Sequence, residues 1–108
     1  MRPRLDDVLG ALADPTRRSL FERLATDGPD TATHLAVGLP VSRQAVVKHL
    51  QVLSGAGLLT AERAGREVRY RADPRAMDDA VAWMVRTGAE WDRRLGRLRR
   101  RVETHGTG

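Results

Sequence analysis

The feature that most limits how this chain can fold is a seven-residue repeat in its C-terminal part. Between residues 77 and 102, apolar or small side chains recur at alternating spacings of four and three residues, at Met77, Val81, Met84, Gly88, Trp91, Leu95, Leu98 and Val102. This pattern is typical of one continuous helix whose apolar stripe packs against another helix. We expect that helix to run from about residue 75 to residue 102.

The predicted helix is too long for one small domain to cover. It would extend ~42 Å, whereas a compact domain of 100 residues has a radius of gyration of only ~13 Å. The chain has 108 residues, which suits one domain without a second core. A second copy of the chain is the simplest partner, so we predict a homodimer. The alternative is a helix that folds back on its own domain for part of its length and frays near residues 99–101.

Three shorter helices are predicted before residue 40. The first has Leu5, Val8, Leu9 and Leu12 at helical spacing, and we expect it to lie beside the last helix in the dimer. Asp14 can cap the second helix and Pro15 fits its first turn. The second helix ends at Gly28-Pro29, and the third is a short segment capped by Thr31 or Thr33.

The helix that follows has two different faces. Ser42 is its expected N-cap, and Gly55-Ala56-Gly57 ends it after about residue 54. At ~100° per residue, one face collects Arg43, Gln44, Val47, Lys48 and Gln51. The other face collects Ala45, Val46, Leu50, Val52 and Leu53. We expect the second face to pack on the preceding helices, which makes a helix-turn-helix unit.

Residues 58–72 change to a period of two and predict a β-hairpin with its turn at Ala64-Gly65-Arg66. Arg63 and Arg66 lie at or beside the tip, and Arg69 and Arg71 share one strand face. A basic hairpin beside a recognition helix is typical of a wing, which contacts phosphates or a narrow minor groove. Arg69 could instead pair with Glu62 or Glu67.

The exposed helix face is either an ordinary solvated surface or a set of side chains suited to reading DNA. In a helix-turn-helix, the N-terminal part of the second helix enters the major groove. There Arg43 could bind guanine, Gln44 could bind adenine and Val47 could contact a thymine methyl group. Ser42 and Lys48 suit phosphates. His49 falls on the apolar side, where a partly buried structural histidine competes with a phosphate donor.

Composition limits the other classes of function. The net charge is +5 with a single lysine, Lys48, which favours an acidic partner such as nucleic acid, although a surplus of arginine can also reflect a GC-rich genome. No apolar run approaches the ~20 residues of a membrane span, so a cytoplasmic protein is expected. The absence of cysteine excludes disulfides and thiolate metal sites. His34, His49 and His105 lie apart, without a catalytic signature, so no enzyme and no cofactor is predicted.

Three stretches of the chain resemble the ArsR family of winged helix-turn-helix transcriptional regulators. They are ALADPTRRSLFERL (residues 11–24), VSRQAVVKHLQVLSGAGLL (41–59) and ERAGREVRYRADP (62–74). The resemblance implies a mostly α fold with a small β-hairpin, a winged helix-turn-helix with long N- and C-terminal dimerisation helices. It also implies a homodimer that represses by occupying a palindromic operator.

The helix face, the hairpin and the apolar repeats, together with the resemblance, predict DNA contacts and a dimer interface on this chain. The DNA contacts are Ser42, Arg43, Gln44, Val47, Lys48 and His49 in the helix, and Arg63, Arg66 and Arg69 in the wing. The dimer interface is Leu5, Val8, Leu9, Leu12, Met77, Val81, Met84, Trp91, Leu95 and Leu98. We expect a DNA-binding domain at 1–74, a dimerisation helix of the same domain at 75–102 and a disordered tail at 103–108.

The chain departs from the metal-sensing members of that family. Those members place thiolates in the third helix, or paired His and carboxylate ligands in the last one. Here the third helix has His34 alone, and the last helix has Asp78, Asp79, Glu90 and Asp92 without a nearby histidine. We therefore expect a repressor that does not respond to metal. The alternative is a winged-helix module that binds proteins and not specific DNA.

Overall fold

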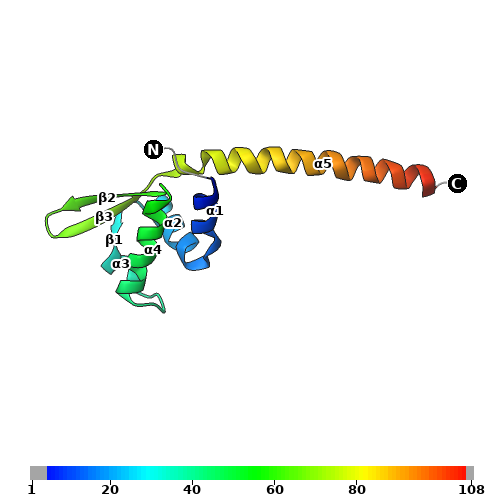
Figure 1. The fold of residues 1–108 in the computed structure, drawn as a ribbon. Helices are drawn as coiled ribbons and strands as arrows, with labels where there is room; N and C mark the ends of the chain where they lie inside the picture. The colour runs from blue at the N-terminus through cyan, green and yellow to red at the C-terminus, as the bar shows by residue number, and fades with distance from the viewer. Residues whose placement is uncertain (1–4, 107–108) are drawn as a thin grey trace. The chain divides into compact units, whose positions relative to one another are not determined.

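The computed structural model describes residues 5–106 and is mostly helical (Figure 1). It divides into two compact units, one up to Asp78 and one from Asp79 onward. The predicted boundary at residues 74 and 75 lies four residues before that division. In chain order the elements are α1 (Leu5–Ala13), α2 (Pro15–Asp27), β1 (Asp30–Thr31), α3 (Ala32–Ala36), α4 (Arg43–Gly55), β2 (Leu59–Ala64), β3 (Glu67–Ala72), η1 (Pro74–Met77) and α5 (Asp78–Gly106).

Side-chain caps set the starts of α2, α3 and α4, as the sequence predicts. Asp14 accepts a hydrogen bond from the backbone N–H of Arg17 at 3.0 Å, and Ser42 Oγ accepts one from Ala45 at 3.1 Å. Of the two candidates for α3, Thr31 is the cap, because its Oγ1 accepts from the N–H of His34 at 3.2 Å. Each cap satisfies a backbone donor that the first helical turn leaves unpaired.

The core of the first unit is an apolar centre between α1, α2, α3 and α4, closed by the residues that enter the sheet. Its fully buried large side chains are Val8, Leu20, Leu35, Val46, Leu50, Leu53 and Leu58. Leu58 joins helix to sheet, since its N–H donates to Leu53 and its carbonyl accepts from Asp73. Burying such a side chain contributes ~1.5–3 kcal/mol, so these seven residues largely fix how α4 sits on the domain.

The packing of α4 agrees with the predicted division into two faces, with one exception. Val46, Leu50 and Leu53 are buried, whereas Val52 is 45% exposed. Val52 was predicted on the packed face, and that prediction is wrong. The position lies at the edge of the apolar arc, where α1 and α2 leave a shallow hollow next to it.

Val8 was predicted to lie in a dimer interface, but it is buried inside its own domain. Its side chain is 1% exposed because α1 packs on both α2 and α4. Val8 is therefore a core residue of its own domain and has no surface for a second chain. Leu5, Leu9 and Leu12 on the same helix are half-buried.

The hairpin forms as predicted, and a third strand joins it. The register pairs Leu59 with Ala72 and Ala64 with Glu67, which leaves Gly65 and Arg66 as a two-residue loop. Gly65 has φ 65°, the conformation that a glycine adopts in such tight hairpins. The third strand, β1, was not predicted; its two residues pair with β3 and give the order β1-β3-β2. Figure 1 shows the hairpin extending beyond the helices.

The second unit is almost entirely the helix α5. The predicted helix start at residue 75 is wrong by a turn, because residues 74–77 form the 3-10 segment η1, whose first N–H group is capped by Asp73 at 3.2 Å. The predicted tail is also wrong in part, since α5 extends to Gly106. No proline or glycine interrupts the chain between Gly96 and Gly106, so the helix continues. Residues 107–108 lie outside the described range.

The apolar repeat of α5 is an exposed stripe within this unit. Val81, Met84, Trp91, Leu95 and Leu98 are 47–55% exposed, and Val102 is 62% exposed. We call these six residues the α5 seam. Met77 lies in η1 instead and is half-buried. Among the described helices, none is long and apolar enough to cross a membrane.

Candidate nucleic-acid interface

The N-terminal half of α4 exposes a row of hydrogen-bonding side chains. Ser42, Arg43, Gln44 and Lys48 are all exposed, and Val47 between them is half-buried. The Ser42 hydroxyl is occupied as a cap for the N–H of Ala45. The remaining free N–H groups of the first turn carry the positive end of the helix dipole, which attracts an anion such as phosphate.

Arg43 is held in place by the neighbouring helix. Its Nε donates to the hydroxyl of Thr33 in α3 at 2.9 Å. The two Nη groups remain available, and two parallel N–H donors are what a guanine edge or a phosphate accepts. The sequence suggests Thr33 only as a cap. Its bond with Arg43 depends on the angle between α3 and α4, which no spacing in the sequence reports.

A groove connects α3, the start of α4 and the wing. It has a volume of about 540 Å³ and is lined by Thr33, His34, Arg43, Val47, Arg66 and Tyr70 among others. Two of these, Arg43 and Arg66, are among the four arginines predicted to contact DNA. The fold thus brings the N-terminal end of α4 and the wing tip to the same hollow surface.

The wing arginines lie in different surroundings. Arg63 and Arg66 are exposed at the hairpin tip. Arg69 is opposite Glu62 in the ladder, and its closest carboxylate oxygen belongs to Glu67 on its own strand, at 4.0 Å. An exposed pair at that distance contributes little, ~0–1 kcal/mol. Arg69 therefore keeps most of its capacity to bind another anion.

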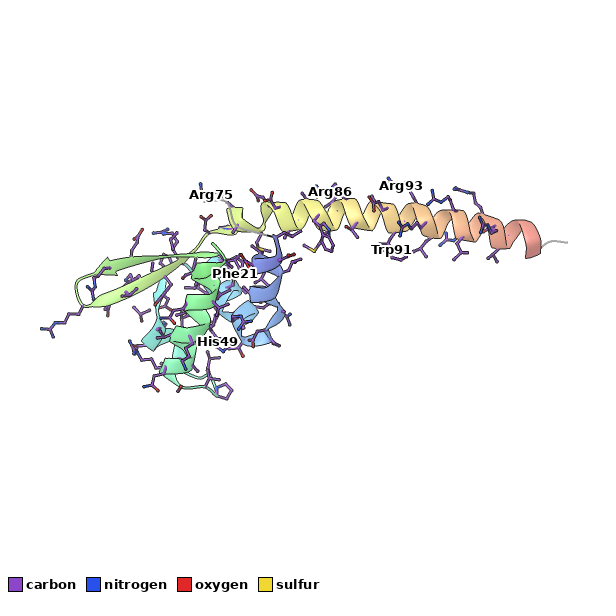
Figure 2. All side chains as sticks on the ribbon, in the orientation of Figure 1. Phe21, His49, Arg75, Arg86, Trp91 and Arg93 are labelled. Atoms are coloured by element: carbon purple, nitrogen blue, oxygen red, sulfur yellow. The ribbon has the colours of Figure 1, made fainter. Side chains whose placement is uncertain are left out.

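His49 lies away from this row. It is half-buried on α4, where Figure 2 labels it. This placement favours the structural role for His49 over a contact with phosphate.

Comparison with known proteins agrees with the fold. Residues 12–62 match a family model described as a helix-turn-helix domain. An ArsR-like transcriptional regulator from Rhodococcus sp. RHA1 is 42% identical, covers 87% of this chain and 88% of its own, and superposes with a TM-score of 0.72. The chain belongs to the ArsR family.

Two further similar proteins are described as a transcriptional regulator and as a DNA-binding domain. The HTH-type transcriptional regulator Rv2034 of Mycobacterium tuberculosis is 49% identical over 64% of this chain and 64% of its own length. The structure of Mb0332 from Mycobacterium bovis, described as a homodimeric winged helix-turn-helix DNA-binding domain, is 25% identical with a TM-score of 0.59. It covers 81% of this chain and 77% of its own. The chain thus spans less than two thirds of Rv2034.

These relatives are transcriptional regulators and not enzymes, as we expect of this chain. The winged helix-turn-helix prediction is confirmed by the likeness to Mb0332 and by the small antiparallel sheet. The domain boundaries and the individual site residues remain predictions.

The metal ligands of sensing ArsR-family members have no counterpart here among the described residues. No group of three or more His, Cys, Asp or Glu side chains converges there, and the sequence has no cysteine. His34 instead binds the carboxylate of Asp30 one turn earlier. Burial raises the pKa of Asp30, but the hydrogen bonds from His34 and from the N–H of Thr31 outweigh it and lower the pKa overall. This pair stabilises the start of α3.

Proposed function

We propose that this ArsR-family protein is a sequence-specific DNA-binding regulator that represses transcription as a dimer. The α4 helix enters the major groove, and the wing contacts the backbone beside it. Arg43 and Gln44 select bases, while Lys48 and Arg66 bind phosphates. Ser42, Val47, Arg63 and Arg69 support the same surface.

The observation that supports this proposal best is the exposed row at the start of α4. Arg43, Gln44 and Lys48 are all exposed on the face opposite the buried Val46 and Leu50. These long polar side chains lie in solvent, where a polar partner can reach them. A major groove of ~12 Å width admits such a helix, and its base edges accept from arginine and glutamine.

The dimer rests on the α5 seam. Six large apolar side chains that are about half exposed form one stripe, and monomers rarely expose so continuous an apolar surface. A second copy of α5 supplies the matching surface. A two-fold dimer binds a palindromic operator, because each protomer places its recognition helix on one half-site.

We also propose that the repressor does not respond to metal. A transition-metal site needs several converging nitrogen, sulfur or oxygen ligands. The pair of His34 and Asp30 supplies two such ligands, which is too few. Operator affinity measured with zinc and then with a chelator should be the same. A change of tenfold or more between the two conditions would show a metal site formed across the dimer.

The test of the central proposal is footprinting of the DNA upstream of the protein's own gene. The expected result is a protected palindrome that persists at moderate salt with an excess of nonspecific competitor DNA. The proposal fails if competitor removes all binding, and a weak, salt-insensitive interaction would favour a protein-binding winged helix instead.

A further inference from the structure

The side of α5 opposite the seam carries a row of arginines. We call Arg86, Arg93, Arg97 and Arg100 the outer arginine face. At ~100° per residue these positions fall within an arc of about 60°, centred about 180° from the seam. Figure 2 shows Arg86 and Arg93 on one side of the helix and Trp91 on the other.

The positive charge of the whole protein is concentrated in this part of α5. Residues 93–101 contain six arginines and no carboxylate, whereas all the other residues together contain 13 basic and 14 acidic side chains. The winged helix-turn-helix unit, residues 1–78, has 12 basic and 10 acidic side chains and so supplies only +2 of the net charge of +5. The net charge indicates an acidic partner, and the positive charge is densest in residues 93–101 of α5.

The two central arginines of this row have no partner that would explain them as helix stabilisers. Arg93 and Arg97 are exposed, and within the described part of the chain no ion pair joins either of them to a carboxylate. Arg94 lies against the ring of Trp91 at 5.3 Å, on the flank of the seam. Like charges three or four residues apart destabilise a helix, and the helix dipole favours cations only in the last turn, near Gly106.

We propose that the outer arginine face binds the phosphate backbone of duplex DNA regardless of sequence, as a second contact separate from α4 and the wing. Guanidinium groups bind phosphate through two parallel N–H donors. Arg93, Arg97 and Arg100 span ~10 Å of helix, and DNA carries one negative charge per ~1.7 Å of its axis. Several phosphates can therefore face this one row.

Duplex DNA fits this face better than a membrane does. An interfacial helix buries its apolar side in the lipid, and the apolar side of α5 is the seam that the proposed dimer covers. Once two seams pair, the outer arginine face is what remains exposed on each helix. The inference goes beyond the operator contact, because it needs no specific sequence.

The experiment measures binding of the full chain to a duplex that lacks the operator, over a range of salt concentrations. The test variant is Arg93→Gln with Arg97→Gln, since glutamine keeps a similar length and helix propensity. The slope of log affinity against log salt should flatten by about 0.9 for each phosphate that the variant no longer binds, so by ~2 for each chain whose face meets DNA. The operator footprint should keep its position and base preference.

The matched control is Arg94→Gln with Arg99→Gln, which removes the same charge from the flanks of the seam. Its slope should change by less than half as much. Equal slopes for the two double variants would overturn the proposal, because net charge alone would then explain the binding.

The proposal would also be overturned if the slope of the test variant were unchanged. If vesicles of anionic lipid then retained the wild-type protein and not the variant, the face would be assigned to membranes. Failure of the operator footprint in the wild type bears only on the proposed function. Circular dichroism and light scattering check that both variants stay helical and keep the wild-type mass.

Discussion

Arg43 in α4 and Thr33 in α3 are joined by a hydrogen bond of 2.9 Å from Nε to Oγ1. The bond crosses from the first helix of the helix-turn-helix to the second and fixes one end of the guanidinium group. Ordering an arginine before it meets DNA reduces the side-chain entropy lost on binding, which for such a side chain is up to ~2 kcal/mol. Thr33 is thus a positioning residue for the base contact that we propose for Arg43.

Replacing Thr33 with valine keeps the shape of the side chain and removes the acceptor. A hydrogen bond contributes ~0.5–1.5 kcal/mol net, so operator affinity should fall about two- to tenfold, with the loss concentrated at the base pair that Arg43 reads. Affinities for operators substituted one base pair at a time check this. Thr33→Ser keeps the hydroxyl and should restore the preference. A Thr33→Val variant with wild-type preference at every position would remove Thr33 from the recognition surface.

Arg43 and Arg66 line one groove but should behave differently when they are removed. Arg43→Ala should relax the preference at one base pair by ~1–3 kcal/mol, because the paired hydrogen bonds to a base edge can no longer form. Arg66→Ala should weaken all sequences similarly and flatten the salt slope by ~1. Titrations on operator and mutated operators at several salt concentrations separate the two effects. The same loss of base preference in both variants would mean that Arg66 reads bases and not the backbone.

Ser42 caps α4, and we propose that it also lies near a DNA phosphate; two substitutions separate these roles. Ser42→Ala leaves the N–H of Ala45 without its acceptor and should lower the free energy of unfolding by ~1 kcal/mol. Ser42→Asp keeps the cap, so its stability should match the wild type, but its negative charge should repel the backbone and weaken DNA binding. Urea unfolding and gel shifts measure the two quantities. If Ser42→Asp bound DNA as well as the wild type, α4 would lie with this end away from phosphate.

The sequence predicted the elements of the first unit because their ends are decided locally. Asp14 and Ser42 each cap a helix through an N–H group three residues later, and Gly65 forms the two-residue hairpin loop. The spacing of the apolar residues predicts which face of α4 is buried, the one that contains Leu50. The strand β1 was not predictable in this way. Its two residues show no alternation, and it forms only because β3 presents an open edge beside Thr31.

The candidate site was predictable as a set of exposed residue types and less so as a geometry. The exposure of Arg43 and Gln44 is predicted by the helical periodicity of α4. The bond from Arg43 to Thr33 and the groove shared with Arg66 depend on how three elements pack, and no pattern within one element reports that. Val8 illustrates the same limit, since spacing alone cannot tell a helix stripe that meets its own domain from one that meets a second chain.

Asp14 should make the protein sensitive to acid. The N–H of Arg17 stabilises the charged carboxylate and lowers its pKa below the ordinary value of 3.8. A group with a lowered pKa in the folded state contributes stability above its unfolded pKa and loses it as the pH falls through the folded value. Asp14→Asn keeps a good cap without the titration, so its stability relative to the wild type should rise between pH 5 and about pH 3. Urea unfolding across this range checks the sign, and parallel curves for the two proteins would contradict it.

The seam of α5 gives the sharpest test of the dimer. Leu95 is 53% exposed at the middle of the stripe, and burial of one leucine contributes ~1.5–3 kcal/mol. Leu95→Lys removes that contribution from both chains and adds a charge, so the dimer should weaken by about 100-fold or more. Light scattering at micromolar concentration should then report a monomer, and binding to a palindromic operator should weaken with it.

The control adds the same charge to the same helix away from the seam. Ala89 is exposed and lies about 130° around α5 from the centre of the stripe, so Ala89→Lys should leave the mass of the dimer unchanged. Circular dichroism separates loss of the dimer from loss of the helix. A Leu95→Lys protein that still scatters as a dimer would show that the chains pair elsewhere, for example through the half-buried Leu5, Leu9 and Leu12 of α1.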